Sequence, residues 1–122
     1  MVLLAGCDPQ ADLEQRTRRY FEMPASQHVN AVTIRSAILS GTPLGSSPEQ
    51  VYAYLERRGI GKDGLSAYYP LNYLGAKDKI VCLIGYNPKT LGVVKNKFSV
   101  FFLMDRDQKL QDIQVQEWHT GL

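Results

Sequence analysis

Cysteine and histidine are the side chains in this sequence best suited to chemistry, and the chain has two of each. A cysteine thiolate beside a histidine is a nucleophile in many hydrolases, so Cys82 would need His28 or His119 next to it. Cys82 stands among apolar residues in the stretch IVCLIGY, where a free cysteine is usually a buried, unreactive part of the core. The two histidines lie near opposite ends of the expected domain, residues 28–122. We therefore expect no catalytic pair.

Aspartates close in sequence raise the question of a metal site. Asp105 and Asp107 begin like a calcium-binding loop, but Leu110 stands where glycine is needed and Gln116 fills the twelfth position. An exposed hairpin turn, in which aspartates are turn formers, explains the pair better, and nothing there would raise a pKa for acid catalysis. Two histidines and two separated cysteines give no zinc ligand set. We expect no metal, no cofactor and no enzyme activity.

The N-terminal stretch Leu4-Ala5-Gly6-Cys7 resembles the lipobox of bacterial lipoproteins. In that box small residues let the extended chain enter the signal peptidase, and the cysteine thiol forms the thioether to diacylglycerol. The basic region and the apolar stretch of about 7–15 residues that complete a signal peptide do not precede it. Either the sequence starts inside a longer precursor, which we favour, or the match is accidental.

The lipobox resemblance implies an organisation for the whole chain. We expect residues 1–6 to be the remnant of a signal peptide, 7–27 to hold the lipid attachment and a polar tether, and 28–122 to form one domain. Two acyl chains on Cys7 suffice for stable anchoring, and acylation excludes a disulfide with the second cysteine. An aspartate directly after the acylated cysteine, as at Asp8, favours the inner membrane in enteric bacteria. The expected location is the periplasm-facing side of the envelope.

The stretch DPQADLEQRTRRYFEMPASQ is polar and poor in aliphatic side chains. It is either an extended tether or a helix that starts at Asp8 and Pro9. The helix would carry on one side Leu13, Thr17, Tyr20 and Phe21.

A dense basic cluster lies within the same stretch and consists of Arg16, Arg18 and Arg19. Beside a lipid anchor, each such residue can gain about 1 kcal/mol from anionic headgroups. Most short charge clusters are solvated faces, and we prefer that interpretation to a membrane-proximal patch.

The overall composition excludes several classes of protein. Of the 122 residues, 44% are hydrophobic and 21% are charged, which is typical of one globular domain. The formal net charge of +2 is too small to indicate nucleic-acid binding. The longest apolar run after the N-terminus, IVCLIGY, is far shorter than the ~20 residues that a membrane-spanning helix needs.

The start and end signals of one helix agree in the stretch SPEQVYAYLERRG. Ser47 fits the N-cap, Pro48 the first helical position and Gln50 the capping-box position. Gly59 can adopt the left-handed conformation that ends a helix. We predict a helix of about three turns between Ser47 and Gly59.

After this helix the hydrophobic period changes to two, and turn residues punctuate the chain. The strand-like segments are 65–70, 72–74, 79–86, 97–104 and 109–118. The segment 97–104 has apolar residues at both odd and even positions, so both of its faces are apolar. We therefore place it in the centre of the sheet, between 79–86 and 109–118. The upstream segment 28–41 is either a strand or a short helix. This order predicts an α+β fold, with one or two helices packed on an antiparallel meander sheet in two layers.

The capped helix and the ending FSVFFLMDRDQKLQDIQV together resemble a family of small envelope lipoproteins. These have the SmpA/OmlA (BamE)-like or β-lactamase-inhibitor-protein-like fold, and the resemblance loosely covers residues 41–118. It implies a non-catalytic protein-binding scaffold on the envelope. The assembly-factor members usually follow the helix with a Leu-Gly-x-Pro turn, whereas Leu55 is followed here by Glu56, Arg57 and Arg58. A role in outer-membrane assembly is therefore not carried over.

Tyrosine is the residue type that most suggests a partner surface. Tyr52 points away from the apolar face of the predicted helix, and Tyr68, Tyr69 and Tyr73 crowd one short stretch. Exposed tyrosines anchor interfaces because they bury area at low entropic cost. The alternative is that they pad the sheet edges and the rim of the core. Our binding hypothesis joins these four tyrosines into one surface.

These observations predict a lipid-anchored envelope protein that binds an unknown envelope protein. One alternative is a small-ligand-binding or enzymatic domain with a pocket between helix and sheet, which a convergent polar pocket around Cys82 or His28 would support. The other alternative is a cytosolic protein with an accidental lipobox.

Overall fold

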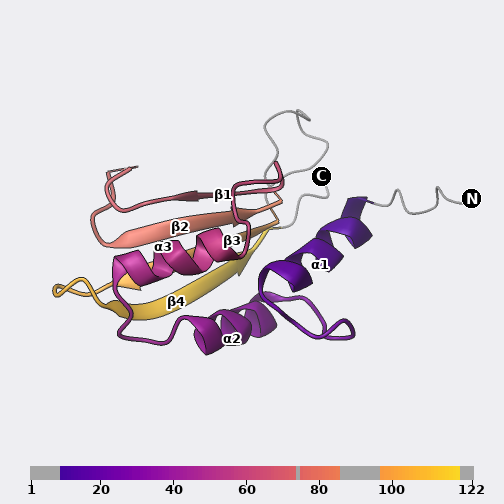
Figure 1. Ribbon diagram of the computed structural model, residues 1–122, viewed down its shortest axis with the longest axis horizontal. Helices are drawn as coiled ribbons and strands as arrows, with labels where there is room; N and C mark the ends of the chain where they lie inside the picture. The colour runs from indigo at the N-terminus through magenta and orange to yellow at the C-terminus, as the bar shows by residue number, and fades with distance from the viewer. Residues whose placement is uncertain (1–8, 74, 86–96, 119–122) are drawn as a thin grey trace, which may run out of the picture.

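Helices precede strands throughout the part of the chain that the computed structural model describes, residues 9–73, 75–85 and 97–118 (Figure 1). The elements in this part are α1 (Pro9–Tyr20), α2 (Ala31–Gly41), α3 (Pro48–Arg57), β1 (Ser66–Tyr69), β2 (Lys79–Ile84), β3 (Phe98–Met104) and β4 (Leu110–Glu117).

The four strands form one antiparallel sheet in the order β1-β2-β3-β4. Val81 of β2 lies opposite Phe101 of β3, and Phe101 lies opposite Gln114 of β4. Near the end of β3 the register with β4 shifts, which indicates a β-bulge. The predicted meander, with the segment 97–104 between its two neighbours, is confirmed.

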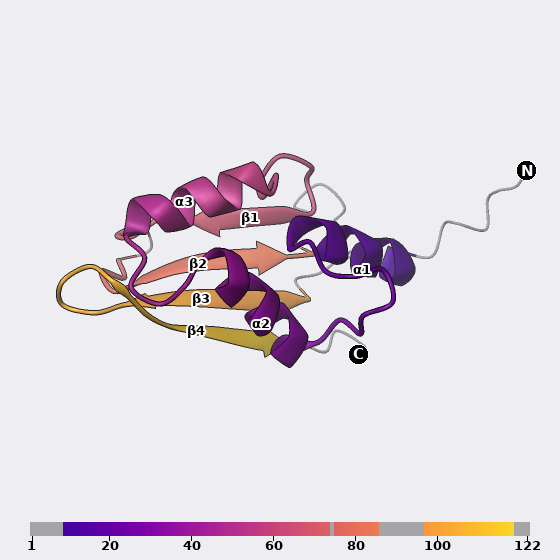
Figure 2. The same ribbon diagram turned by 60° about the horizontal axis from the view of Figure 1, so that its bottom comes forward.

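The helices lie on one face of the sheet, so the domain has two layers (Figure 2). Because side chains alternate along a strand, every second strand residue points into the space between the layers. The α+β class is confirmed, with three helices in the described residues. The core side chains that lose all contact with solvent include Ile34, Ile38, Val51, Leu55, Ile80, Cys82, Ile84, Val100, Phe102 and Ile113.

Helix α3 begins and ends where its capping residues predict. The Ser47 hydroxyl accepts a hydrogen bond from the Gln50 backbone N–H, and the Gln50 side chain accepts one from the Ser47 N–H at 2.7 Å. At the other end, Gly59 has φ +81 and the Ile60 N–H donates to the Leu55 carbonyl at 3.1 Å. These bonds satisfy terminal backbone groups that the helix itself leaves unpaired.

The ambiguous segment 28–41 forms helix α2. Asn30 caps it: the Asn30 side chain accepts from the Thr33 N–H at 2.9 Å, and the Thr33 hydroxyl accepts from the Asn30 N–H at 3.0 Å. Ile34 and Ile38, one helical turn apart, are fully buried. Ser36, midway between them, is exposed, whereas in a strand it would point to the same side as Ile34 and Ile38.

Residues 9–20 form helix α1, the second of the two alternatives for this polar stretch. Leu13, Tyr20, Phe21 and Met23 are buried in the same hydrophobic core as the other helices and the sheet. The described residues before position 28 therefore belong to the folded unit and are not an extended tether. Residues 1–8, which include Cys7, lie outside the described residues.

The described part of the expected short strand 72–74 is a turn. The Tyr73 N–H donates to the Pro70 carbonyl at 3.2 Å, and the Asn72 N–H donates to the Ala76 carbonyl at 2.8 Å. Asn72 has φ +71, a left-handed conformation that asparagine tolerates and that a strand excludes. Among the described helices, none has the length and apolar character to cross a bilayer.

Candidate functional site

The four tyrosines expected to bind a partner form two stacked pairs. The rings of Tyr52 and Tyr68 lie 6.1 Å apart, and those of Tyr69 and Tyr73 lie 5.1 Å apart, each pair inclined by 27°. Tyr68 and Tyr69 are neighbours in β1, so their side chains point to opposite faces of the sheet. One pair thus lies on the helix side and the other on the far side, and the four do not form one continuous surface.

The pair on the helix side is held by hydrogen bonds within the domain. The Tyr52 hydroxyl accepts from the Leu71 N–H at 3.1 Å, and the Tyr68 hydroxyl donates to the Glu56 carboxylate at 2.8 Å. Partial burial, together with the neighbouring Glu56 carboxylate, raises the pKa of Tyr68 to about 12. Tyr52 and Tyr68 therefore help to join α3 to the strand β1, besides any contact with a partner.

The pair on the far side belongs to a larger apolar surface. In the register of the sheet, Tyr69 lies opposite Val81, and Val81 lies opposite Phe101. Tyr73 is 65% exposed and stacks on Tyr69. The residues that we call the open face come from β1, β2, β3, the turn after β1 and the position directly after β4: Tyr69, Tyr73, Val81, Leu83, Phe101, Leu103 and Trp118.

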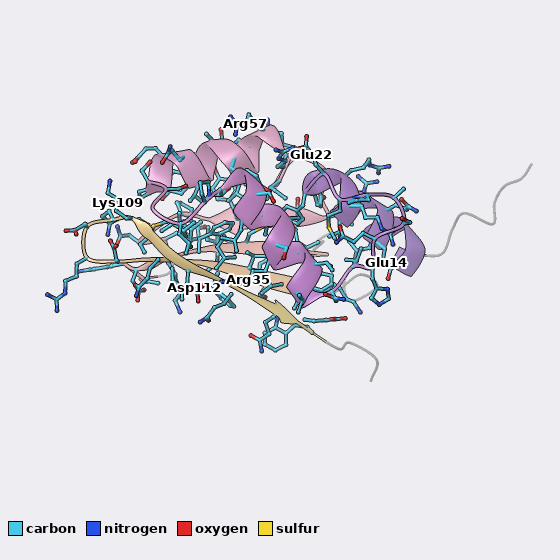
Figure 3. The ribbon with its side chains drawn as sticks, turned by 90° about the horizontal axis from the view of Figure 1, so that it is seen from below. Glu14, Glu22, Arg35, Arg57, Lys109 and Asp112 are labelled. Carbon is cyan, nitrogen blue, oxygen red and sulfur yellow. The ribbon has the colours of Figure 1, made fainter. Side chains whose placement is uncertain are left out.

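The open face is bordered by polar groups. The Lys79 ammonium group lies 5.7 Å from the centre of the Phe101 ring, a cation–π geometry. Trp118 is 42% exposed, and its indole N–H donates to the Ser99 hydroxyl at 2.7 Å. Gln114 of β4 lies opposite Phe101 in the register. No described helix covers this side of the sheet (Figure 3).

A groove of about 330 Å³ lies between the helices, away from the open face. Its charged residues are Arg58 and Glu22. Arg58 Nη1 lies 2.6 Å from the Glu22 carboxylate, and the Arg58 guanidinium lies 5.0 Å from the centre of the Tyr54 ring. The groove is lined by α2, α3 and the connection after α1. It lies between helices, not between helix and sheet, and neither Cys82 nor His28 lines it.

The cysteine and histidine candidates are separated. Burial raises the pKa of the Cys82 thiol to about 12, because it lies in the core without solvent. His28 lines a cavity of about 130 Å³ together with Glu14, Lys97 and Glu117. Across residues 9–73, 75–85 and 97–118, no three His, Cys, Asp or Glu side chains form a metal-binding group. His119 lies outside the described residues.

Two members of the basic cluster contact groups within the domain. Arg16 Nη1 lies 3.3 Å from Asp63 Oδ2, and Arg18 Nε donates to the Gln27 carbonyl at 2.9 Å. Arg19 is exposed. Their positions in the second half of α1 also favour cations, because the helix dipole is negative at that end.

Asp63 connects α1 to the loop before β1. Its carboxylate accepts hydrogen bonds from the Tyr20 hydroxyl and, at 3.0 Å, from the Leu65 N–H. Although burial opposes its ionisation, these bonds and the Arg16 guanidinium hold the pKa of Asp63 below its usual value. Burial and the bond to Asp63 raise the pKa of Tyr20.

The open face was missed in the sequence although β3 gives a signal for it. The stretch FSVFFLM is apolar at both parities, which we interpreted as a central position in the sheet. The same pattern also means that both faces of the sheet are apolar there. Since the described helices cover one face, Phe101 and Leu103 remain partly exposed on the other.

Comparison of this chain with protein-family models, with curated proteins and with solved structures finds no match.

Proposed function

We propose that this chain is a lipid-anchored protein of the bacterial cell envelope, facing the periplasm, whose domain binds another protein and is not an enzyme. The open face supports the binding part of this proposal most directly. It combines three aromatic residue types with branched aliphatic side chains, on the side of the sheet that no described helix covers. Its best exposed members are Tyr73 and Trp118.

The composition of the open face is typical of a protein interface. Folded monomers rarely expose contiguous apolar patches larger than a few hundred Å², and patches of that size often mark interaction sites. Tyrosine, tryptophan and phenylalanine are enriched at the centres of interfaces, and polar groups at their rims. Lys79 and the glutamines of β4 provide such a rim here. A protein partner fits better than a small ligand, because the residues lie along strands and line no cavity of appreciable volume among those described.

The anchoring part of the proposal rests on the sequence Leu4-Ala5-Gly6-Cys7. Mass spectrometry of the product isolated from its host, compared with a Cys7→Ala variant, tests it. We expect the mass of a diacylglycerol or triacyl group on the wild-type chain and its loss in the variant. An unmodified wild-type chain would overturn the anchor and leave the binding part to its own test.

Site-specific cross-linking in the host tests the binding part. The photoreactive residue p-benzoylphenylalanine replaces Tyr73 on the open face or, as a matched control, Val32 on α2, which is 74% exposed. We expect a discrete cross-linked product from position 73 that position 32 does not give. No product from position 73, or the same product from both positions, would overturn the proposal.

A further inference from the structure

The groove between the helices has the size and lining of a small-molecule site. Its volume of about 330 Å³ falls within the range of ligand pockets, about 300–1,000 Å³. The buried residues Phe21, Met23 and Tyr54 give it an apolar base. Helix α2 contributes only small residues, so it does not fill the space in front of α3: Thr33, Ser36, Ala37, Ser40 and Gly41. Such pockets combine an apolar lining with a few polar groups.

One cation and one carboxylate are present among the described residues that line the groove, and they pair with each other. The cation is Arg58, the C-cap of α3, whose side chain is 19% exposed. Its Nη1 lies 2.6 Å from the carboxylate of Glu22, whose side chain is 71% exposed. Arg58 Nε is buried and has no hydrogen-bond partner among the described residues. A buried cation needs a counter-ion, and here that counter-ion lies at the surface, where solutes can reach it.

The backbone of Glu22 has an unusual conformation. The Glu22 N–H donates to the Arg19 carbonyl at 3.4 Å, and the Met23 N–H donates to the Arg18 carbonyl at 2.8 Å. This is the Schellman pattern that ends a helix, and Glu22, with φ +55, takes the left-handed position that glycine usually fills. Residues held in rarely populated conformations cluster at ligand-binding and switch sites. Figure 3 shows Glu22 beside the end of α3, where its carboxylate meets the cation.

We propose that the groove binds a small monocarboxylate with an aromatic or aliphatic body, and that Glu22 fills the carboxylate position on Arg58 until the ligand replaces it. Arginine can bind a carboxylate through two parallel N–H···O bonds. A single cation suits a monoanion, because a second negative charge would be buried without a partner. The body of the ligand would lie against Phe21, Met23 and Tyr54. This inference goes beyond the proposed function, since the groove and the open face lie on opposite sides of the sheet.

Titration of the full chain with 3-phenylpropionate tests this inference. The neutral 3-phenylpropionamide has the same shape without the charge and is the matched control ligand. We expect 3-phenylpropionate to bind with a dissociation constant on the order of 1 mM, which is ordinary for its size. It should shift the amide NMR signals of Ser40 and Gly41 in the groove and leave those of Phe101 and Leu103 on the open face unchanged. The neutral ligand should bind about tenfold more weakly or less, because it lacks the hydrogen bond between charged groups.

Variants of Glu22 separate a ligand site from a structural ion pair. Glu22→Gln keeps the length of the side chain and removes the competing charge, so it should strengthen 3-phenylpropionate binding by about tenfold. Glu22→Gly suits the left-handed backbone, so it should strengthen binding as well without lowering the melting temperature. If the ion pair served the fold alone, both variants would melt at a lower temperature and neither would gain affinity. That result would overturn the inference.

Variants of the two neighbouring arginines test which cation holds the ligand. Arg58→Gln should abolish 3-phenylpropionate binding. The matched control is Arg57→Gln, at the adjacent exposed position, which does not line the groove and should leave the affinity unchanged. Circular dichroism shows whether Arg58→Gln folds, and the Glu22 variants decide the matter if it does not.

Other outcomes would also overturn the inference. These are equal affinity for the charged and the neutral ligand, no binding of 3-phenylpropionate by wild type or Glu22→Gln, and NMR shifts confined to the open face. Tighter binding of a peptide that ends in a C-terminal phenylalanine carboxylate would replace the free ligand by a chain terminus. None of these results depends on the open face, so cross-linking from position 73 decides independently whether the domain binds another protein.

Discussion

Replacing Asp63 by asparagine should loosen helix α1 from the rest of the domain. The Asp63 carboxylate accepts from the hydroxyl of Tyr20 in α1 and lies 3.3 Å from Arg16 Nη1 in the same helix. It also accepts from the Leu65 N–H in its own loop. The Asp63→Asn variant keeps the shape of the side chain but removes its charge and one acceptor oxygen.

The expected cost follows from these contacts. A hydrogen bond to a charged group contributes about 1.5–3 kcal/mol when well buried, whereas an exposed ion pair contributes about 0–1 kcal/mol. Because solvent reaches part of the Asp63 side chain, we take the lower ends and expect the free energy of unfolding to fall by about 1.5 kcal/mol at pH 7. The matched control is Asp107→Asn, in the exposed β3–β4 turn, which should change stability by less than about 0.5 kcal/mol.

The stability lost in the Asp63→Asn variant should depend on pH. The folded-state pKa of Asp63 is lowered, so its stabilisation is present above the unfolded pKa of about 4 and is lost as the pH falls through the folded value. Urea unfolding followed by circular dichroism should therefore show that the difference in free energy of unfolding between wild type and Asp63→Asn decreases below about pH 4. If this difference is absent at pH 7, or is equally large at pH 3, the account of how α1 is held is refuted.

Three further predictions concern the core and the caps. Gly41→Ala should lower stability by about 1–2 kcal/mol in thermal unfolding despite the better helix propensity of alanine, because its Cβ would lie 2.5 Å from Tyr54 Cε1; a gain in stability would contradict this. Cys82 should react with Ellman's reagent only as fast as the chain unfolds, since its thiol is fully buried with a pKa of about 12. Rapid labelling of a Cys7→Ala chain would show the thiol to be accessible. Ser47→Ala should cost about 1 kcal/mol in urea unfolding by removing the cap of α3, whereas Ser47→Gly should cost less.

Local signals in the sequence predicted the elements whose ends are fixed by neighbouring residues. The cap of α3 depends on Ser47 and Gln50, three residues apart, and the inward and outward positions of β4 follow from the alternation of apolar and polar residues after Asp112. The start of helix α2 is harder to predict, because its capping box uses Asn30 and Thr33, without the glutamate or glutamine that marks the common form.

Contacts between distant residues could not be predicted in this way. Tyr20 and Asp63 are 43 positions apart, and nothing local to either residue indicates the other. The division of the tyrosines into two pairs follows from the pleat of β1, which places Tyr68 and Tyr69 on opposite faces. Which of those faces lies under the helices depends on the tertiary structure alone. The position of the open face therefore depends on how the helices pack on the sheet, which local sequence signals do not indicate.

The packing of α1 into the core also limits how far this domain could work from a membrane. Cys7 precedes the buried residue Leu13 by six positions, and an extended chain spans at most about 3.3–3.6 Å per residue. A lipid at Cys7 would hold the core within about 20 Å of the headgroups, where a twenty-residue tether would have allowed several times that radius. The domain would have little freedom to move away from the bilayer, and a partner would have to reach it at the bilayer surface.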